Sequence, residues 1–85
     1  MPNEAAIRAW CLDHLARTLD LPEGEIDPRA EFARLGIDSA SAVHFLVALE
    51  EWLGRELAPE VIVDYPTVAA LARHLIRPSQ RANLP

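Results

Sequence analysis

The chain has 85 residues, enough for one domain that removes roughly 60–65% of its unfolded surface from water, but too few for a deep enzyme cleft. Apolar residues make up 51% of the chain, and it carries 13 acidic and 8 basic side chains, a composition typical of soluble globular proteins. Residues 20–64 hold eleven acids and three arginines, a net charge of −8 that repels nucleic acid and attracts basic protein surfaces. A nucleic-acid-binding function is therefore excluded.

Cysteine and histidine usage gives no metal or disulfide framework. The single cysteine, Cys11, cannot form an intramolecular disulfide, and the three scattered histidines (His14, His44 and His74) do not have the spacing of a zinc site. No signal peptide is apparent, and no apolar run approaches the roughly 18 residues of a membrane helix. The sequence predicts a cytoplasmic protein without a membrane span. An initial Met1 and a short tail favour a freestanding product over an excised domain, and both stay open.

A first helix is predicted from Glu4 to Leu19, with Asn3 as its N-cap. Its apolar residues recur at spacings of three and four along one face: Ile7, Trp10, Cys11, Leu15 and Leu19. Because Cys11 lies on this face, we expect a buried hydrophobic side chain rather than a reactive thiol.

Prolines and glycines then interrupt the pattern and predict a long loop over residues 20–36, with a short helical turn around 30–35. Four apolar residues are spaced as anchors of this loop: Leu21, Ile26, Phe32 and Leu35. Loops of this length are uncommon in compact domains, so we expect this one to be functional.

A second helix is predicted over residues 39–53, ending at Gly54, with two apolar stripes. The core stripe consists of Ala42, Phe45, Leu46, Leu49 and Leu53. The second stripe contains Ala40, Val43 and Val47. It either widens the core face or stays exposed as a partner-binding strip bordered by Asp38, Glu50 and Glu51, and both interpretations stay open.

The last third of the chain predicts two further helices. Pro59 suits the first turn of a short third helix through residues 61–63, and Thr67 suits the N-cap of a fourth helix over 68–77 that stops at Pro78. The expected core stripe of the fourth helix is Val68, Leu71, Leu75 and Ile76. We expect one domain over residues 1–78, a disordered tail over 79–85, and an all-α four-helix bundle with a short, crossing third helix.

The segment from Leu35 to Ser39 displays a serine at the start of the second helix. Gly36 can adopt backbone angles closed to other residues, and Asp38 is a favoured N-cap, so Ser39 falls in the first turn. A hydrolytic serine needs a nearby base and an oxyanion hole, but no strand precedes Ser39, and His44 lies about 140° around the helix. We expect no catalytic residue in this chain and interpret Ser39 as a group offered to another protein.

The run Leu35-Gly36-Ile37-Asp38-Ser39 resembles the Gly-x-Asp-Ser box of acyl carrier proteins, and the resemblance covers about residues 4–77. A second motif, Asp64-Tyr65-Pro66-Thr67 followed by Ala69-Ala70-Leu71, is similar to carriers of polyketide synthases. The resemblance implies a non-catalytic, metal-free monomer. The resemblance further implies that Ser39 receives 4′-phosphopantetheine from coenzyme A through a phosphopantetheinyl transferase, with Asp38 and Gly36 beside the attachment point. The thiol of this arm would hold acyl groups as thioesters.

The resemblance also implies synthase partners that dock on the second helix. These are the transferase, an acyl-loading enzyme (an acyltransferase or adenylate-forming ligase), and a ketosynthase or other synthase enzyme. The ligase is suggested by similarity of residues 49–55 to carriers charged by fatty-acyl adenylate ligases. The expected docking residues are Ala40, Val43, His44, Val47, Glu50 and Glu51. The family commonly has leucine or methionine in place of Ala40, and often an acid in place of His44, so these positions are expected to alter partner contacts.

Two alternatives stay open at this point. A peptidyl carrier of nonribosomal synthesis has the same fold and differs in its cargo. An unmodified helical adaptor would use the same acidic, partly apolar helix to bind a partner, with Ser39 only at the helix start.

Overall fold

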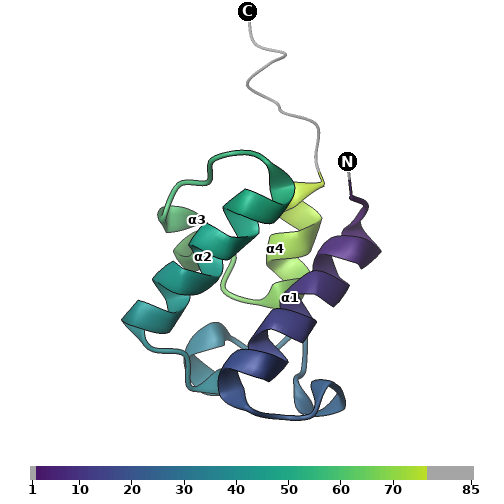
Figure 1. Ribbon diagram of the computed structural model, residues 1–85, viewed down its shortest axis with the longest axis vertical. Helices are drawn as coiled ribbons and strands as arrows, with labels where there is room; N and C mark the ends of the chain where they lie inside the picture. Colours follow the sequence, from purple (N-terminus) through teal and green to yellow (C-terminus); the bar gives the residue numbers. More distant parts are fainter. Residues whose placement is uncertain (1, 77–85) are drawn as a thin grey trace, which may run out of the picture.

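The computed structural model describes residues 2–76, and Figure 1 shows the arrangement of their helices. The elements are α1 (Glu4–Leu19), α2 (Ser39–Leu53), α3 (Glu60–Asp64) and α4 (Val68–Leu75), with 3₁₀ helices η1 (Glu23–Glu25) and η2 (Phe32–Leu35) in the first loop. Helix α1 packs against both α2 and α4. No strand occurs among residues 2–76, where one isolated antiparallel bridge joins Glu31 and Thr67. The predicted all-α, four-helix fold is confirmed.

Side-chain and backbone caps set the helix ends. Asn3 Oδ1 accepts a hydrogen bond from the Ala6 N–H at 2.8 Å, as predicted for the start of α1. Helix α2 ends at Leu53, and its C-cap Gly54 takes the left-handed conformation at φ 75° and donates its N–H to the Glu50 carbonyl. Thr67 Oγ1 accepts from the Ala70 N–H at 3.0 Å at the start of α4. The bounds of α1 and α2 are those that the sequence predicts, because local capping chemistry determines both.

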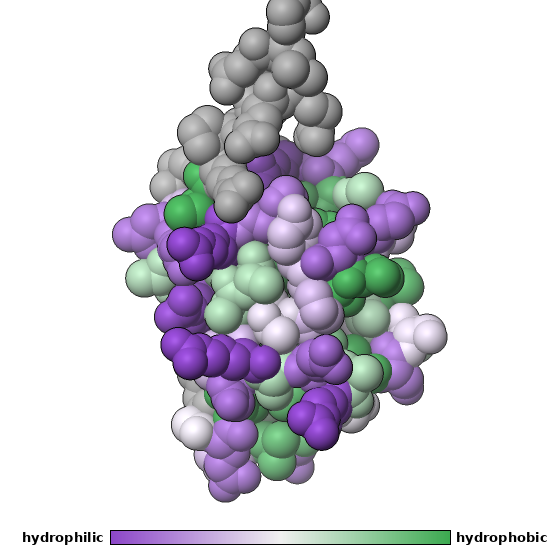
Figure 2. Space-filling view, turned by 180° about the vertical axis from the view of Figure 1, so that it is seen from behind, coloured by the Kyte–Doolittle hydropathy of each residue, from purple (hydrophilic) through white to green (hydrophobic). Residues whose placement is uncertain are grey.

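The core draws side chains from all four α-helices and from the first loop. Its buried members are Ile7, Cys11, Leu15, Ala16, Ile26, Phe32, Phe45, Leu46, Leu49, Val61, Val68, Leu71, Ala72 and Leu75. No polar or charged residue is buried within the described part of the chain. On the rear face, shown in Figure 2, hydrophilic residues are interspersed with smaller apolar areas. The helices therefore turn most of their large apolar side chains inward.

Two apolar residues expected to pack against the domain, one as a loop anchor and one in the core stripe of the fourth helix, are exposed instead. Leu21 is 40% exposed, because α1 ends at the left-handed Asp20 (φ 57°) and the chain turns back, with the Leu21 N–H bonded to the Ala16 carbonyl. Ile76 is 39% exposed, because α4 ends at Leu75 and Ile76 forms its C-cap.

Other predicted boundaries shift slightly. Helix α3 begins at Glu60 with Pro59 as its N-cap, and α4 is shorter than the predicted 68–77. The guanidinium of Arg55 donates to the Leu75 carbonyl at 2.9 Å and so satisfies one acceptor at the end of α4. Arg77, Pro78 and the predicted tail over 79–85 lie outside the described residues.

Two of the three histidines, which lie far apart in the sequence, meet in the fold. The rings of His14 on α1 and His44 on α2 stack with centroids 6.0 Å apart. Trp10 stacks on His14 at 5.1 Å and on Trp52 at 5.3 Å, which extends the aromatic row along the α1–α2 contact. Residues 2–76 contain no group of three or more side chains placed to hold a metal ion, and no helix long and apolar enough to cross a membrane.

The environment of His14 predicts a loss of stability on mild acidification. Burial lowers the pKa of His14, the charges of His44 and Arg17 lower it further, and Asp13 opposes them. Unfolded His14 titrates near its ordinary pKa of about 6.5, so the unfolded chain binds more protons below that pH. The stability that depends on neutral His14 is therefore present above pH 6.5 and is lost as the pH falls through the lowered pKa of the folded protein. We expect the urea midpoint to fall over this window.

An NMR titration of the imidazole resonances checks the cause. His44→Gln should move the pKa of His14 upward, toward the ordinary value, because one neighbouring positive charge is removed. Titration of His14 at an ordinary pKa in both proteins would exclude this explanation.

Candidate functional site

Ser39 is exposed as the first residue of α2. The preceding Asp38 has extended backbone angles, and its Oδ1 accepts a hydrogen bond from the Ser41 N–H at 2.8 Å. The Asp38 carbonyl accepts from the Ala42 N–H at 2.9 Å, the first main-chain bond of the helix. This cap fixes where α2 begins, and therefore where the Ser39 hydroxyl is displayed.

Gly36 forms the turn that leads into the cap. It has φ 90° and is the C-cap of η2, where its N–H donates to the carbonyls of Ala33 and Phe32. A Cβ built at Gly36 would meet no atom within 4 Å, so its backbone conformation rather than crowding favours glycine. The sequence-based interpretation of Gly36 as a conformational residue agrees with this geometry.

The loop before Ser39 is anchored to the start of α4. The Phe32 N–H donates to the Pro66 carbonyl, and the Ala69 N–H donates to the Pro28 carbonyl, both at 2.8 Å. The ring of Phe32 is buried, with its centroid 5.7 Å from that of Phe45 on α2. These contacts hold the first loop and the start of α2 in one frame. The loop over residues 20–36 therefore supports the start of α2, which carries Ser39.

Asp38 places a negative charge beside Ser39. The hydrogen bond from the Ser41 N–H lowers the pKa of Asp38, and a bond from the Ser41 hydroxyl lowers it further. The carboxylate therefore stays ionised at neutral pH. His44 is exposed farther along α2 and stacks on His14, so the structure places its ring in the α1–α2 contact.

The second apolar stripe of α2 is exposed. Val43 is 62% exposed and Val47 is 47% exposed, and Ala40, His44 and Glu51 are exposed beside them. The interpretation of this stripe as a wider core face is therefore wrong. It forms an apolar strip that begins beside Ser39.

Glu50 differs from the other expected docking residues. Its side chain is half-buried, and its Oε2 accepts a hydrogen bond from the Leu57 N–H at 2.7 Å. One carboxylate oxygen thus orders the connection between α2 and α3. Any contact of Glu50 with a partner would therefore use mainly the other carboxylate oxygen, Oε1.

Sequence reasoning missed one exposed valine, which lies on α3. Val63 on α3 is 76% exposed. Helix α3 has five residues, too few to show a repeating apolar stripe. Hydrophobic periodicity therefore could not predict whether Val63 faces the core or the solvent.

A family model described as the phosphopantetheine attachment site matches residues 9–75. The chain belongs to this family. Its members carry 4′-phosphopantetheine, and an exposed hydroxyl at a helix start, as at Ser39, fits covalent attachment of such a group.

Two curated relatives belong to polyketide synthases. A phenolphthiocerol/phthiocerol polyketide synthase of Mycobacterium tuberculosis is 37% identical over 76 residues, which covers 89% of this chain and 4% of the relative. Spectinabilin polyketide synthase system protein NorC of Streptomyces orinoci is 42% identical over 75 residues, covering 87% of this chain and 3% of the relative. The chain therefore corresponds to a small carrier segment of much larger proteins.

Solved carrier structures share the fold. The acyl carrier protein Asl1650 from Anabaena sp. PCC 7120 has a TM-score of 0.82 at 38% identity, over 86% of this chain and 83% of that chain. A free-standing peptidyl carrier protein from Acinetobacter baumannii has a TM-score of 0.81 at 32% identity, over 87% of this chain and 92% of that chain. This chain is thus a carrier domain in sequence and in architecture.

Proposed function

We propose that this carrier domain holds acyl intermediates of polyketide or related lipid assembly as thioesters on a 4′-phosphopantetheine arm attached to Ser39. The observation that carries the proposal is the exposed Ser39 at the capped start of α2, in a chain of the phosphopantetheine family. We infer a non-catalytic monomer that works in the cytoplasm. Polyketide synthases among its relatives favour this cargo over the amino acids of a peptidyl carrier.

The arm supplies a terminal thiol, and this chain supplies its placement. Asp38 fixes the helix start and keeps a negative charge beside the attachment point, which favours a basic surface on the modifying transferase. The transferase provides the base that Ser39 lacks. A tethered acyl group then meets each enzyme at high effective concentration without being released.

The exposed strip of α2 is the proposed docking face for the transferase, the acyl-loading enzyme and a ketosynthase or other synthase enzyme. Its apolar centre is Val43 and Val47, with Ala40, His44 and Glu51 around it and Glu50 at its margin. Such an interface should be small, because a carrier must leave one enzyme to reach the next.

Val43→Asp is expected to slow phosphopantetheine transfer about tenfold, because a buried interface side chain contributes roughly 1–2 kcal/mol and 1.4 kcal/mol is a factor of ten. Val63→Asp on α3 is the matched control, since Val63 is also an exposed valine but lies outside the proposed face. The rate constant for arm transfer, followed by intact mass, measures both. Equal slowing by the two variants would argue against this docking face.

Thiol counting separates the modified from the unmodified protein without denaturation. Cys11, the only cysteine, is fully buried, and burial raises its pKa to about 12. A thiol reagent at mildly alkaline pH should therefore find no thiol in the native unmodified protein and one in the modified protein. In denaturant the counts should rise to one and two. A reactive thiol in the native unmodified protein would contradict the burial of Cys11.

Acyl loading tests the proposed cargo. The modified protein is offered to a panel of acyltransferases and adenylate-forming ligases with acyl or aminoacyl substrates. We expect an acyl thioester that hydroxylamine releases. Loading by aminoacyl substrates alone would instead identify a peptidyl carrier. Failure of Ser39 to accept the arm would favour the alternative of an unmodified helical adaptor.

A further inference from the structure

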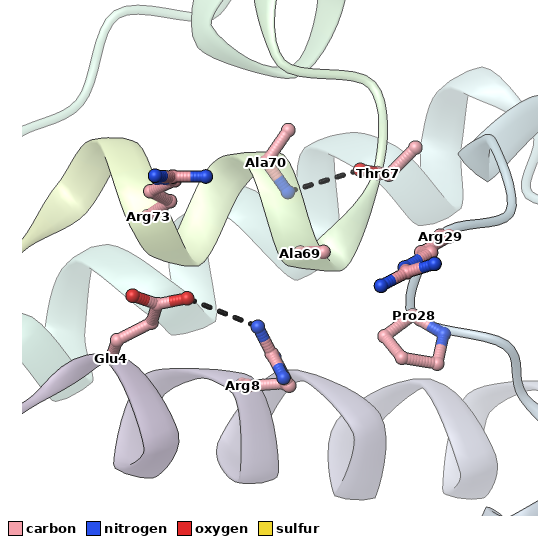
Figure 3. Close-up of a pocket in the computed structure, with 8 residues that line it drawn as sticks. All are labelled: Glu4, Arg8, Pro28, Arg29, Thr67, Ala69, Ala70 and Arg73. Carbon is pink, nitrogen blue, oxygen red and sulfur yellow. Dashed lines mark hydrogen bonds and ion pairs between the residues drawn. The ribbon is translucent and has the colours of Figure 1, made fainter.

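A second surface feature lies between α1, the first loop and the start of α4. Here a partly open pocket of about 390 Å³ is lined by Glu4, Arg8, Pro28, Arg29, Thr67, Ala69, Ala70 and Arg73 (Figure 3). Its volume falls in the range of small-ligand sites. None of its residues belongs to α2 or to the attachment box.

The side chains that line the pocket carry a net positive charge, opposite in sign to that of the whole chain. It contains three arginines and one acid, whereas the whole protein carries a net charge of −5. The arginines come from three separate segments: Arg8 from α1, Arg29 from the loop and Arg73 from α4 (Figure 3). Folding therefore gathers positive charge that is dispersed in the sequence.

The arginines retain unused donors. Arg8 Nη2 pairs with Glu4 Oε2 at 3.0 Å, but Arg8 Nε is buried without a hydrogen-bond partner. Neither Arg29 nor Arg73 forms an ion pair within residues 2–76. In Figure 3 the Arg29 guanidinium extends from the loop toward the space between α1 and α4. Two cations thus border the pocket without a carboxylate partner in this part of the chain.

Backbone groups at the start of α4 contribute little to this donor set. The Ala70 N–H donates to Thr67 Oγ1, and the Ala69 N–H donates to the Pro28 carbonyl. An anion in the pocket would therefore be held by guanidinium groups. These bind carboxylate and phosphate oxygens through paired, charge-assisted hydrogen bonds.

We propose that this pocket binds a carboxylate- or phosphate-bearing anion through Arg29 and Arg73, with Arg8 as a supporting cation. Anion binding by these arginines does not use the Ser39 hydroxyl, because none of the three lies in the attachment box or on α2. The anionic group comes either from a free small molecule or from acidic side chains of a partner protein.

The test follows amide resonances of the ¹⁵N-labelled, unmodified protein at constant ionic strength. Three probes are titrated separately: inorganic phosphate, citrate and a hexa-aspartate peptide. We expect saturable shifts at Ala69 and Ala70 with at least one probe. Arg29→Gln and Arg73→Gln should each weaken that binding about tenfold or more. Arg34→Gln, which removes an exposed arginine outside the pocket, should leave it unchanged.

The probes distinguish the two sources of the anion. Saturation by phosphate or citrate supports a site for free anions, whereas saturation by the peptide alone supports acidic side chains of a partner. Ser39→Ala should bind equally well, so failure of the carrier proposal would leave this result unaffected. Shifts that do not saturate with any probe, or equal weakening by Arg34→Gln, would overturn the proposal.

Discussion

Ser39→Ala is expected to abolish phosphopantetheine transfer completely, because the substitution removes the oxygen that forms the phosphodiester. The Asp38 cap does not use the Ser39 side chain, since Asp38 Oδ1 accepts from the Ser41 N–H. The variant should therefore fold like the wild type. Intact mass after incubation with coenzyme A and a transferase of broad specificity measures the effect.

Ser41→Ala is the matched control for this substitution. It removes a hydroxyl two residues farther along α2, together with its bond to Asp38, and retains the backbone N–H that caps the helix. We expect Ser41→Ala to accept one arm, as the wild type does. Modification of Ser39→Ala, or its loss in a folded Ser41→Ala protein, would assign the attachment point to a different residue.

Phe45→Ala is expected to cause the largest loss of stability. Phe45 is 2% exposed, and its ring lies 5.7 Å from that of Phe32, 5.5 Å from His14 and 6.0 Å from Trp10, measured between centroids. It therefore joins α2 to α1 and to the loop that precedes Ser39. Removing a buried phenylalanine side chain costs about 3–5 kcal/mol, which is comparable with the whole stability of a small domain.

Urea denaturation followed by circular dichroism measures this loss. Val43→Ala on the same helix is the control, because Val43 is mostly exposed and its truncation should change the free energy of unfolding by about 0.5 kcal/mol or less. Since Phe45 supports the loop before Ser39, Phe45→Ala should also reduce arm transfer. Equal midpoints for the two variants would show that the core does not depend on Phe45.

Local chemistry explains why the main helices were predictable. Asn3, Asp38 and Thr67 each cap a helix with a side-chain oxygen, and Gly54 ends α2 in the left-handed conformation. These are short-range signals that a sequence displays directly. The display of Ser39 follows from two of them, the Gly36 turn and the Asp38 cap, so the position of this residue was also predictable.

Contacts between distant segments were not predictable in the same way. The stacking of His14 on His44 depends on how α1 and α2 pack, and the arginine pocket depends on how residues 28–29 meet the start of α4. Hydrophobic periodicity shows which face of a helix is apolar but not which helix covers it. The exposure of Val43 and Val47 was therefore settled only by the fold.

The account depends most directly on whether the wild-type protein accepts the arm. Intact mass is measured after incubation with coenzyme A, magnesium and a phosphopantetheinyl transferase of broad specificity. We predict an increase equal to one phosphopantetheine group, located on Ser39 by fragmentation of the peptide that contains it. An unchanged mass for the folded protein, or an arm located on any other residue, would contradict the account.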